Sequence, residues 1–211
     1  ITIFSPPAER AADALFSAHM VQHLALLVVV PLLFLYGHTG RCMMMGLPRS
    51  WRRVSIPPRR LGGRAMSLLN WMPVVTVTFA AVLWAWHVPA LYDVAVRNDF
   101  VHLTEHAMFL SVALLFWGNV LDRRRGFLRR SMLVFATAFH TGLLGAILVF
   151  APAPLYSVHL HQTLLSITPL TDQELAGLIM WIPMGAVFMG TLAGLMLRGL
   201  GQSEVRQALD A

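Results

Sequence analysis

Apolar residues fall in long runs along this chain, separated by shorter segments that hold most of the polar and charged residues. Each run has about 20 residues, the length of helix that crosses the ~30 Å hydrocarbon core of a bilayer. Helices are expected because backbone groups in lipid must be hydrogen-bonded within their own segment. The pattern predicts an all-α, polytopic transmembrane helix bundle, built as a single integral-membrane domain over residues 1–211, with five spans at about 14–36, 66–86, 100–120, 131–150 and 173–197.

Charge predicts how the bundle is oriented. The chain is 57% hydrophobic and only 12% charged, about half the charged share of a typical soluble domain. All sixteen basic residues are arginines, and all but Arg10 and Arg97 follow the first, third or fifth span. Because such residues favour the cytoplasmic side, we expect the N-terminus outside and the C-terminus in the cytoplasm, in a bacterial cytoplasmic (inner) membrane. The net charge of +6 then marks loops beside membrane lipid, and no nucleic-acid partner is expected.

Histidines gather at the opposite, outer end of the predicted bundle. The chain has nine, and all but His38 and His140 fall in the outer half. Two pairs have i,i+4 spacing, in the segments HMVQH and HLTEH, so the two imidazoles of each pair share one helix face. Ionisable side chains are costly in hydrocarbon and usually serve a function there.

A metal ion is the partner that these histidines predict. Imidazole suits copper, zinc, iron and nickel, and a nearby thioether favours Cu(I). His19, His23, His102, His106 and the adjacent Met20 are therefore candidate ligands of a transient copper site. The alternatives are histidines hydrogen-bonded between helices and a methionine that fills space. Glu105 either orients a neighbouring imidazole or stays protonated in lipid.

Three other functions fit parts of the same pattern. His102–His106 matches the HxxEH motif of metallopeptidases, with Glu105 as base, but no third ligand is identifiable. A b-type haem needs axial ligands on opposed helices, and His23 and His140 are predicted at similar depth. The last is a permanent structural subunit that binds no metal. We predict that the chain is not an enzyme.

Prolines and glycines predict local features of the spans. Pro31, Pro73 and Pro183 are expected to kink or unwind their helices and to free backbone groups that neighbouring helices must satisfy. Gly190 and Gly194 form a GxxxG motif in the last span, which favours close helix contact.

Four segments carry a resemblance to a known family. FSAHMVQHLALLVVVPLLFLYG, WAWHVPALYD, HLTEHAMFL and DQELAGLIMW are laid out as in the CtaG-like cytochrome c oxidase assembly factors, a polytopic membrane family. The resemblance runs from about Phe16 to Leu197. Members of that family usually have further spans before the matched region.

The resemblance implies a role in maturing haem-copper oxidases of the respiratory chain, by supplying or positioning copper at the outer face. The partners would be haem-copper oxidase subunits, which the protein assembles or accompanies. With this resemblance, the structural alternative becomes a permanent structural subunit of a respiratory oxidase complex that binds no metal. Carried over by motif, the residues implicated are His19, Met20, His23, His87, His102 and His106. Asp172 and Gln173 match the last segment without an assigned role.

Overall fold

The structure is a computed structural model that describes residues 11–12, 14–37, 71–159 and 167–210, the last ten of these as helix backbone only. His38 and His161 lie outside the described residues. The elements are helical throughout the described part: α2 (Phe16–Leu24), the π-helical segment η2 (Ala25–Val29), α3 (Val30–Tyr36), α7 (Met72–Trp86), α8 (Pro89–Arg97), α9 (Asp99–Leu121), α10 (Phe127–Phe150), the 3-10 turn η3 (Ser157–His159) and α11 (Pro169–Asp210).

Among the described residues, four stretches are long and apolar enough to cross a membrane, namely Phe16–Tyr36, Asp99–Leu121, Phe127–Phe150 and Pro169–Leu200. The pair α7/α8 is a fifth candidate, bent by 70°. The bend follows from Pro89, which cannot continue a helix and holds Val88 in an extended conformation. The chain is therefore a multi-pass helical membrane protein, as predicted. The second span was expected from residue 66; its helix begins at Met72, and residues 66–70 are outside the described part.

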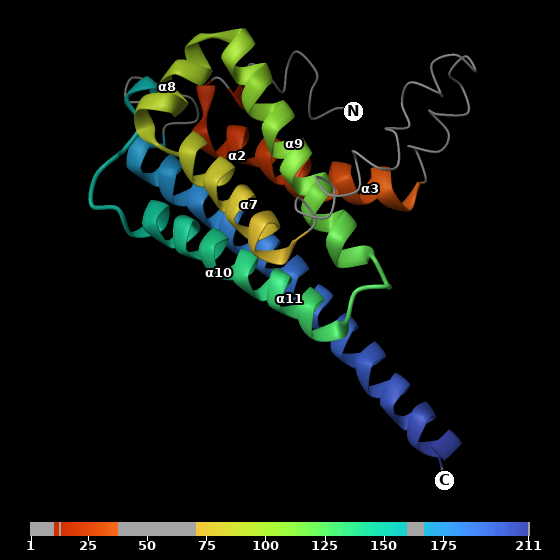
Figure 1. Cartoon of the computed structure of the whole chain (residues 1–211). Helices are drawn as coiled ribbons and strands as arrows, with labels where there is room; N and C mark the ends of the chain where they lie inside the picture. Colours follow the sequence, from red (N-terminus) through yellow and green to blue (C-terminus); the bar gives the residue numbers. More distant parts are fainter. Residues whose placement is uncertain (1–10, 13, 38–70, 160–166, 211) are drawn as a thin grey trace, which may run out of the picture.

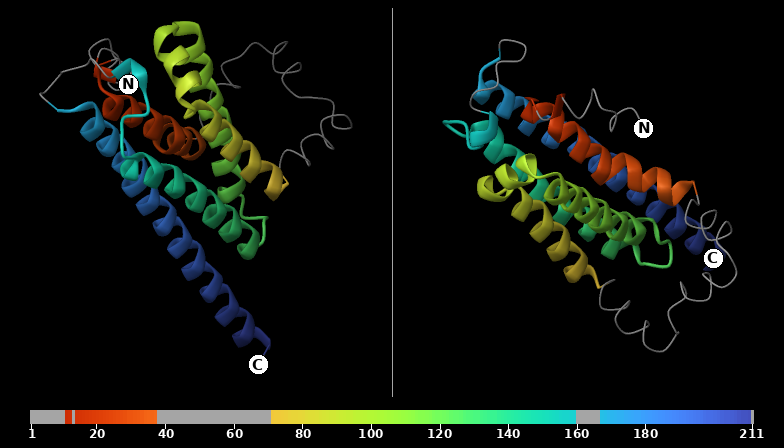
Figure 2. Two further views of the ribbon diagram at one scale, coloured as in Figure 1. Left: turned by 90° about the vertical axis from the view of Figure 1, so that its left-hand side faces the viewer. Right: turned by 90° about the horizontal axis from the view of Figure 1, so that it is seen from above.

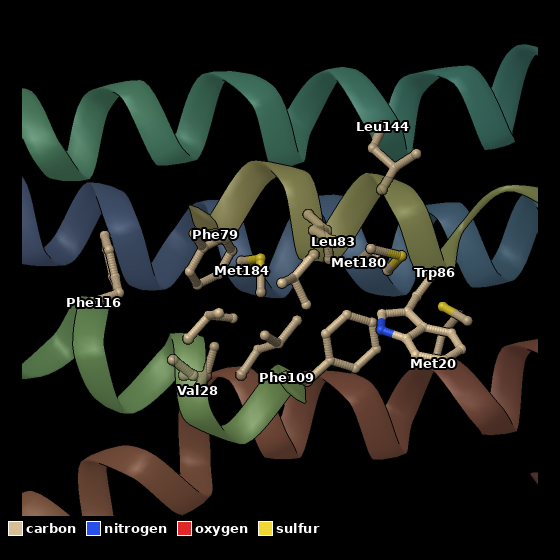
Figure 3. Packing of buried hydrophobic residues seen from close by; sticks show 14 of the residues in the cluster. Met20, Val28, Phe79, Leu83, Trp86, Phe109, Phe116, Leu144, Met180 and Met184 are labelled. Carbon is tan, nitrogen blue, oxygen red and sulfur yellow. The ribbon is translucent and has the colours of Figure 1, made fainter. Parts of the chain in front are cut away.

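The spans lie side by side in one bundle (Figures 1 and 2), and the contacts between them close a ring. Going round it, the first span packs against α11, α11 against α10, α10 against α7, α7 against α9, and α9 against the first span again. Figure 1 shows α11 continuing beyond the other helices toward the C-terminus. Inside the ring lies an apolar core, part of which is drawn in Figure 3, where Phe79, Phe109, Met184 and their neighbours meet.

Pro31 explains the π-helical segment in the first span. Proline has no N–H, so the carbonyl of Leu27, four residues earlier, loses its usual helical partner. The indole Nε1 of Trp117 donates to that oxygen at 2.8 Å. A neighbouring helix thus satisfies the freed backbone group, as predicted. Pro73 does not kink its span, because it lies in the first turn of α7, where proline displaces no hydrogen bond.

The close helix contact is made by a different glycine pair from the one predicted. A Cβ built at Gly177 of α11 would lie 2.9 Å from the carbonyl oxygen of Gly145 on α10. At Gly190 and Gly194 such a Cβ would meet no atom of the described residues within 4 Å. The GxxxG motif therefore makes no tight contact within the described part of the chain.

Candidate metal site

Five side chains that could hold a metal ion converge from two spans near one end of the bundle. His19 and His23 come from α2, and His102, Glu105 and His106 come from α9. They form two overlapping groups, His19/His102/His106 and His19/His23/Glu105, and within each group the ligand atoms lie within 4.8 Å of one another. His19 belongs to both groups. We call the five residues the histidine cluster.

The imidazole rings of the cluster contact one another directly. His19 stacks on His102 with centroids 5.0 Å apart and planes 24° apart. His102 and His106 lie 4.2 Å apart, and His19 and His23 lie 4.3 Å apart. Across the two helices, the centroids of His23 and His106 are separated by 5.6 Å. The two i,i+4 pairs therefore face each other.

Burial differs between the two groups. His19, His23 and Glu105 are at most 1% exposed, whereas His102 and His106 are half-buried. Glu105 Oε1 lies 3.5 Å from His23 Nε2, and Oε2 lies 4.0 Å from His19 Nε2. None of the polar side-chain atoms of His19, His23 and Glu105 has a hydrogen bond to a described residue. Buried polar atoms without partners are costly, and a cation bound between them would satisfy them.

Each helix of the cluster begins at a defined cap. Asn98 caps α9 by accepting hydrogen bonds from the N–H groups of Phe100 and Val101, which places His102 in the first turn. The first turn of α2 is capped from α11 instead. The Asp172 carboxylate accepts from the N–H groups of Phe16 at 2.6 Å and Ser17 at 3.1 Å, and from the Ser17 hydroxyl. A carboxylate at a helix N-terminus is favourable, so Asp172 fixes the turn that carries His19.

His87 lies beside the cluster at the end of α7. Its Nδ1 is 2.7 Å from the carbonyl oxygen of Leu83, which accepts its proton. That bond leaves the Nε2 lone pair available, and Nε2 is buried without a hydrogen bond to a described residue. The ring centroid lies 5.9 Å from that of His23. His87 is thus oriented as a neutral imidazole close to the inner group.

Aromatic side chains pack against the histidine cluster at the same end of the bundle. Tyr92 of α8 hydrogen-bonds to His159 Nε2 at 2.9 Å, and its ring lies 5.1 Å from that of His19. Tyr156 donates its hydroxyl proton to the carbonyl oxygen of His87 at 3.0 Å. Burial raises the pKa of Tyr156, so this hydroxyl remains a donor. Phe16 contacts Tyr92, Tyr156 and His159.

Gln173 holds the segment that carries Tyr156. Its Oε1 accepts from the N–H of Leu155 at 2.6 Å, and its Nε2 donates to the carbonyl oxygen of Leu148 at 3.2 Å. That carbonyl is among the last of α10, which has no later N–H to bind it. Together with Asp172, Gln173 therefore anchors α2 and the connection after α10 to the start of α11.

The remaining candidates lie elsewhere. Met20 is fully buried in the apolar core, where Figure 3 draws it among the core side chains. His140, considered above as a haem ligand with His23, packs against Phe79. Sequence reasoning missed Tyr92 and Tyr156. The signal that could have identified Tyr92 is its position in WHVPALYD, five residues after His87.

Comparison with known proteins gives one match. The model of the cytochrome c oxidase caa3 assembly factor family (Caa3_CtaG) matches residues 1–201. No curated protein and no solved structure matches the chain significantly.

Proposed function

Because the chain belongs to the cytochrome c oxidase caa3 assembly factor family, we propose that it carries copper for the oxidase in its histidine cluster. The observation that carries this proposal is the meeting of His19, His23, His102, Glu105 and His106 from two spans, with ligand atoms at metal-binding separation. Imidazole is a good copper ligand. Copper is the cargo expected because the oxidases assembled by such factors contain copper beside haem.

The two groups differ in a way that suits entry and retention. The outer group, His19/His102/His106, includes the half-buried histidines and receives the ion. The inner group, His19/His23/Glu105, is sealed. The ion passes inward by exchanging His102 and His106 for His23 and Glu105, while His19 stays bound. A cation deeper in low dielectric needs a compensating charge, which the Glu105 carboxylate supplies.

Thioether ligation has no part in this proposal. Neighbouring residues of a helix point about 100° apart, since 3.6 residues make a turn. Met20 therefore faces the apolar core when His19 faces the cluster. The ligand set is imidazole and carboxylate, with His87 Nε2 as a further imidazole beside His23. Such a set does not select Cu(I) over Cu(II), and it also suits zinc.

The cluster opens to the outer face if the arginine-rich end is cytoplasmic. Arg123, Arg124 and Arg125 follow α9 at its other end, a whole span away from His102. By the positive-inside rule that end faces the cytoplasm. We place the protein in a bacterial cytoplasmic membrane, with the histidine cluster accessible from outside.

Copper content of the purified protein tests the proposal. Wild type, His19→Ala and His140→Ala would be loaded with copper in detergent, washed with a competing chelator and analysed for metal. His19→Ala should retain at least about tenfold less copper, because His19 belongs to both groups. The matched control His140→Ala should retain as much as wild type. Equal copper in all three proteins would refute the proposal.

Oxidase assembly in cells separates copper carriage from a permanent structural role. If the histidine cluster supplies copper, His19→Ala should lower the activity of the oxidase, and added copper should partly restore it. A variant that supports normal oxidase activity without binding copper would favour a resident subunit that binds no metal.

A zinc hydrolase is the second function that the geometry supports. His19 supplies the third histidine that the HxxEH segment lacks by itself. Glu105 would then serve as the general base for zinc-bound water. The test is a peptidase activity of the zinc-loaded protein that Glu105→Gln abolishes. The family match favours copper carriage.

A further inference from the structure

A cationic pocket lies at the end of the bundle opposite the histidine cluster. It has a volume of about 560 Å³ and lies between the turn after α9, the first residues of α10 and the part of α11 near residue 198. Five of its lining residues are arginines: Arg123, Arg124, Arg125, Arg130 and Arg198. No acidic residue is among the described residues that line it.

Two arginines of this pocket have contacts that fix their positions. Arg125 contacts Asp122 at 3.2 Å, with both side chains partly exposed. Arg130 is held in place because its Nε donates to the carbonyl oxygen of Val120 at 2.6 Å, a neutral acceptor. Guanidinium groups gathered around one hollow repel one another, and they bind phosphate well through their fixed array of N–H donors. The pocket is therefore complementary to a phosphate group.

A groove lined by both apolar and polar residues continues from the cationic pocket along the spans. It lies between α3, α9 and α11, and it shares Arg130, Leu195 and Arg198 with the pocket. Its other lining residues include Leu32, Trp117, Val120, Gly190 and Gly194. The two glycines leave open space in the groove beside α11, because a Cβ at either would meet no described atom within 4 Å.

We propose that the cationic pocket and the groove together bind one phospholipid with an anionic headgroup. The phosphodiester lies among the arginines, and an acyl chain lies along the groove over Gly190 and Gly194. A water-soluble phosphate would use the pocket but not the groove. A neutral, zwitterionic lipid would use the groove but gain less from the arginines, each of which attracts an anionic headgroup.

Native mass spectrometry of the full chain in detergent tests this site. The protein would be equilibrated with phosphatidylglycerol or phosphatidylcholine carrying identical acyl chains. We expect phosphatidylglycerol to be retained preferentially. Arg130→Gln with Arg198→Gln should weaken its retention by at least about tenfold, given the attraction of each arginine for anionic lipid. Arg129→Gln is the control, because Arg129 lies near the same turn but lines neither the cationic pocket nor the groove.

A second pair of variants tests the groove independently of charge. Gly190→Leu fills the groove and should weaken retention of phosphatidylglycerol. Gly185→Leu adds the same side chain to the same helix, where a Cβ also meets no described atom, but outside the groove, and should retain the lipid. Inorganic phosphate should compete poorly. Equal retention of both lipids, or unchanged retention in Gly190→Leu together with full displacement by inorganic phosphate, would overturn the proposal.

Discussion

The histidine end and the arginine end of this bundle use ionisable groups in opposite ways. At the histidine end, the cluster residues are buried or half-buried, and the start of α2 is fixed by hydrogen bonds to Asp172 of the distant α11. At the arginine end, the charged side chains are exposed or partly exposed, and Arg125 pairs with Asp122, three residues earlier. Burial makes the position of each polar atom costly to change, so the histidine end is built for precise placement. The arginine end instead presents positive charge that attracts anionic groups.

Helix packing differs between the same two ends. Near the histidine end, α10 and α11 approach so closely at Gly145 and Gly177 that neither position has room for a Cβ. Toward the arginine end, Gly190 and Gly194 of α11 border an open groove. Three comparisons between variants can break or sharpen the contrast between the two ends.

Gly177→Ala should have the largest effect on stability. Its Cβ would lie 2.8 Å from Val149 Cγ2 and 2.9 Å from both the Gly145 oxygen and Leu148 Cβ. Two of these atoms belong to the backbone or adjoin it, so the helices must separate, at a cost of about 3 kcal/mol. The measurement is the free energy of unfolding in detergent micelles.

Gly190→Ala is the matched control for that measurement. It places the same methyl group on the same helix without a clash. Alanine favours a helix over glycine by about 1 kcal/mol, so Gly190→Ala should be neutral or slightly stabilising. Similar losses of stability in both variants would contradict the difference in packing between the two ends.

Asp172→Asn should have the next largest effect. The buried carboxylate caps α2 through two backbone N–H groups and the Ser17 hydroxyl, and bonds to a charged acceptor contribute about 2 kcal/mol. The expected drop in Tm is about 4–8 °C. Copper retention should also fall, because His19 lies in the first turn of α2.

Asp122→Asn makes the identical chemical change at the arginine end. Asp122 accepts from the N–H of Arg124 and pairs with Arg125 in a partly exposed position. Such pairs contribute less than about 1 kcal/mol, so Tm should hardly move and copper retention should be unchanged. If the two aspartate variants lost equal stability, the capping bonds of Asp172 would contribute no more than the exposed ion pair of Asp122.

The spans could be predicted from the sequence because each is an apolar run of membrane-spanning length. Their ends moved by a few residues where caps decide them, as Asn98 does for α9. The helix α8 was not predicted, because it is short and its separation from α7 depends on one proline, Pro89. Hydropathy averaged over a span does not respond to a single residue of this kind.

The candidate site could be predicted only in part. Spacing placed His19 with His23 and His102 with His106, since each pair lies on one helix. That the two helices face each other depends on packing around the whole ring, which no local pattern contains. The cap from Asp172 to Ser17 joins residues 155 positions apart. The predicted role of Met20 rested on its adjacency to His19, and adjacency in sequence does not mean a shared helix face; Met20 lies in the apolar core.

The boundary between the two ends is the π-helical segment of the first span, and a substitution there should have a smaller effect than Gly177→Ala or Asp172→Asn. Trp117→Phe removes the donor to the Leu27 carbonyl, which Pro31 cannot satisfy. In a Pro31→Ala background the restored N–H of residue 31 can bind that oxygen, so the same substitution should cost less. The difference between the two backgrounds, read from a double-mutant cycle of unfolding free energies, should be about 1 kcal/mol. A difference of zero would mean that Trp117 stabilises the span through packing alone and that the π-helical segment does not depend on its indole.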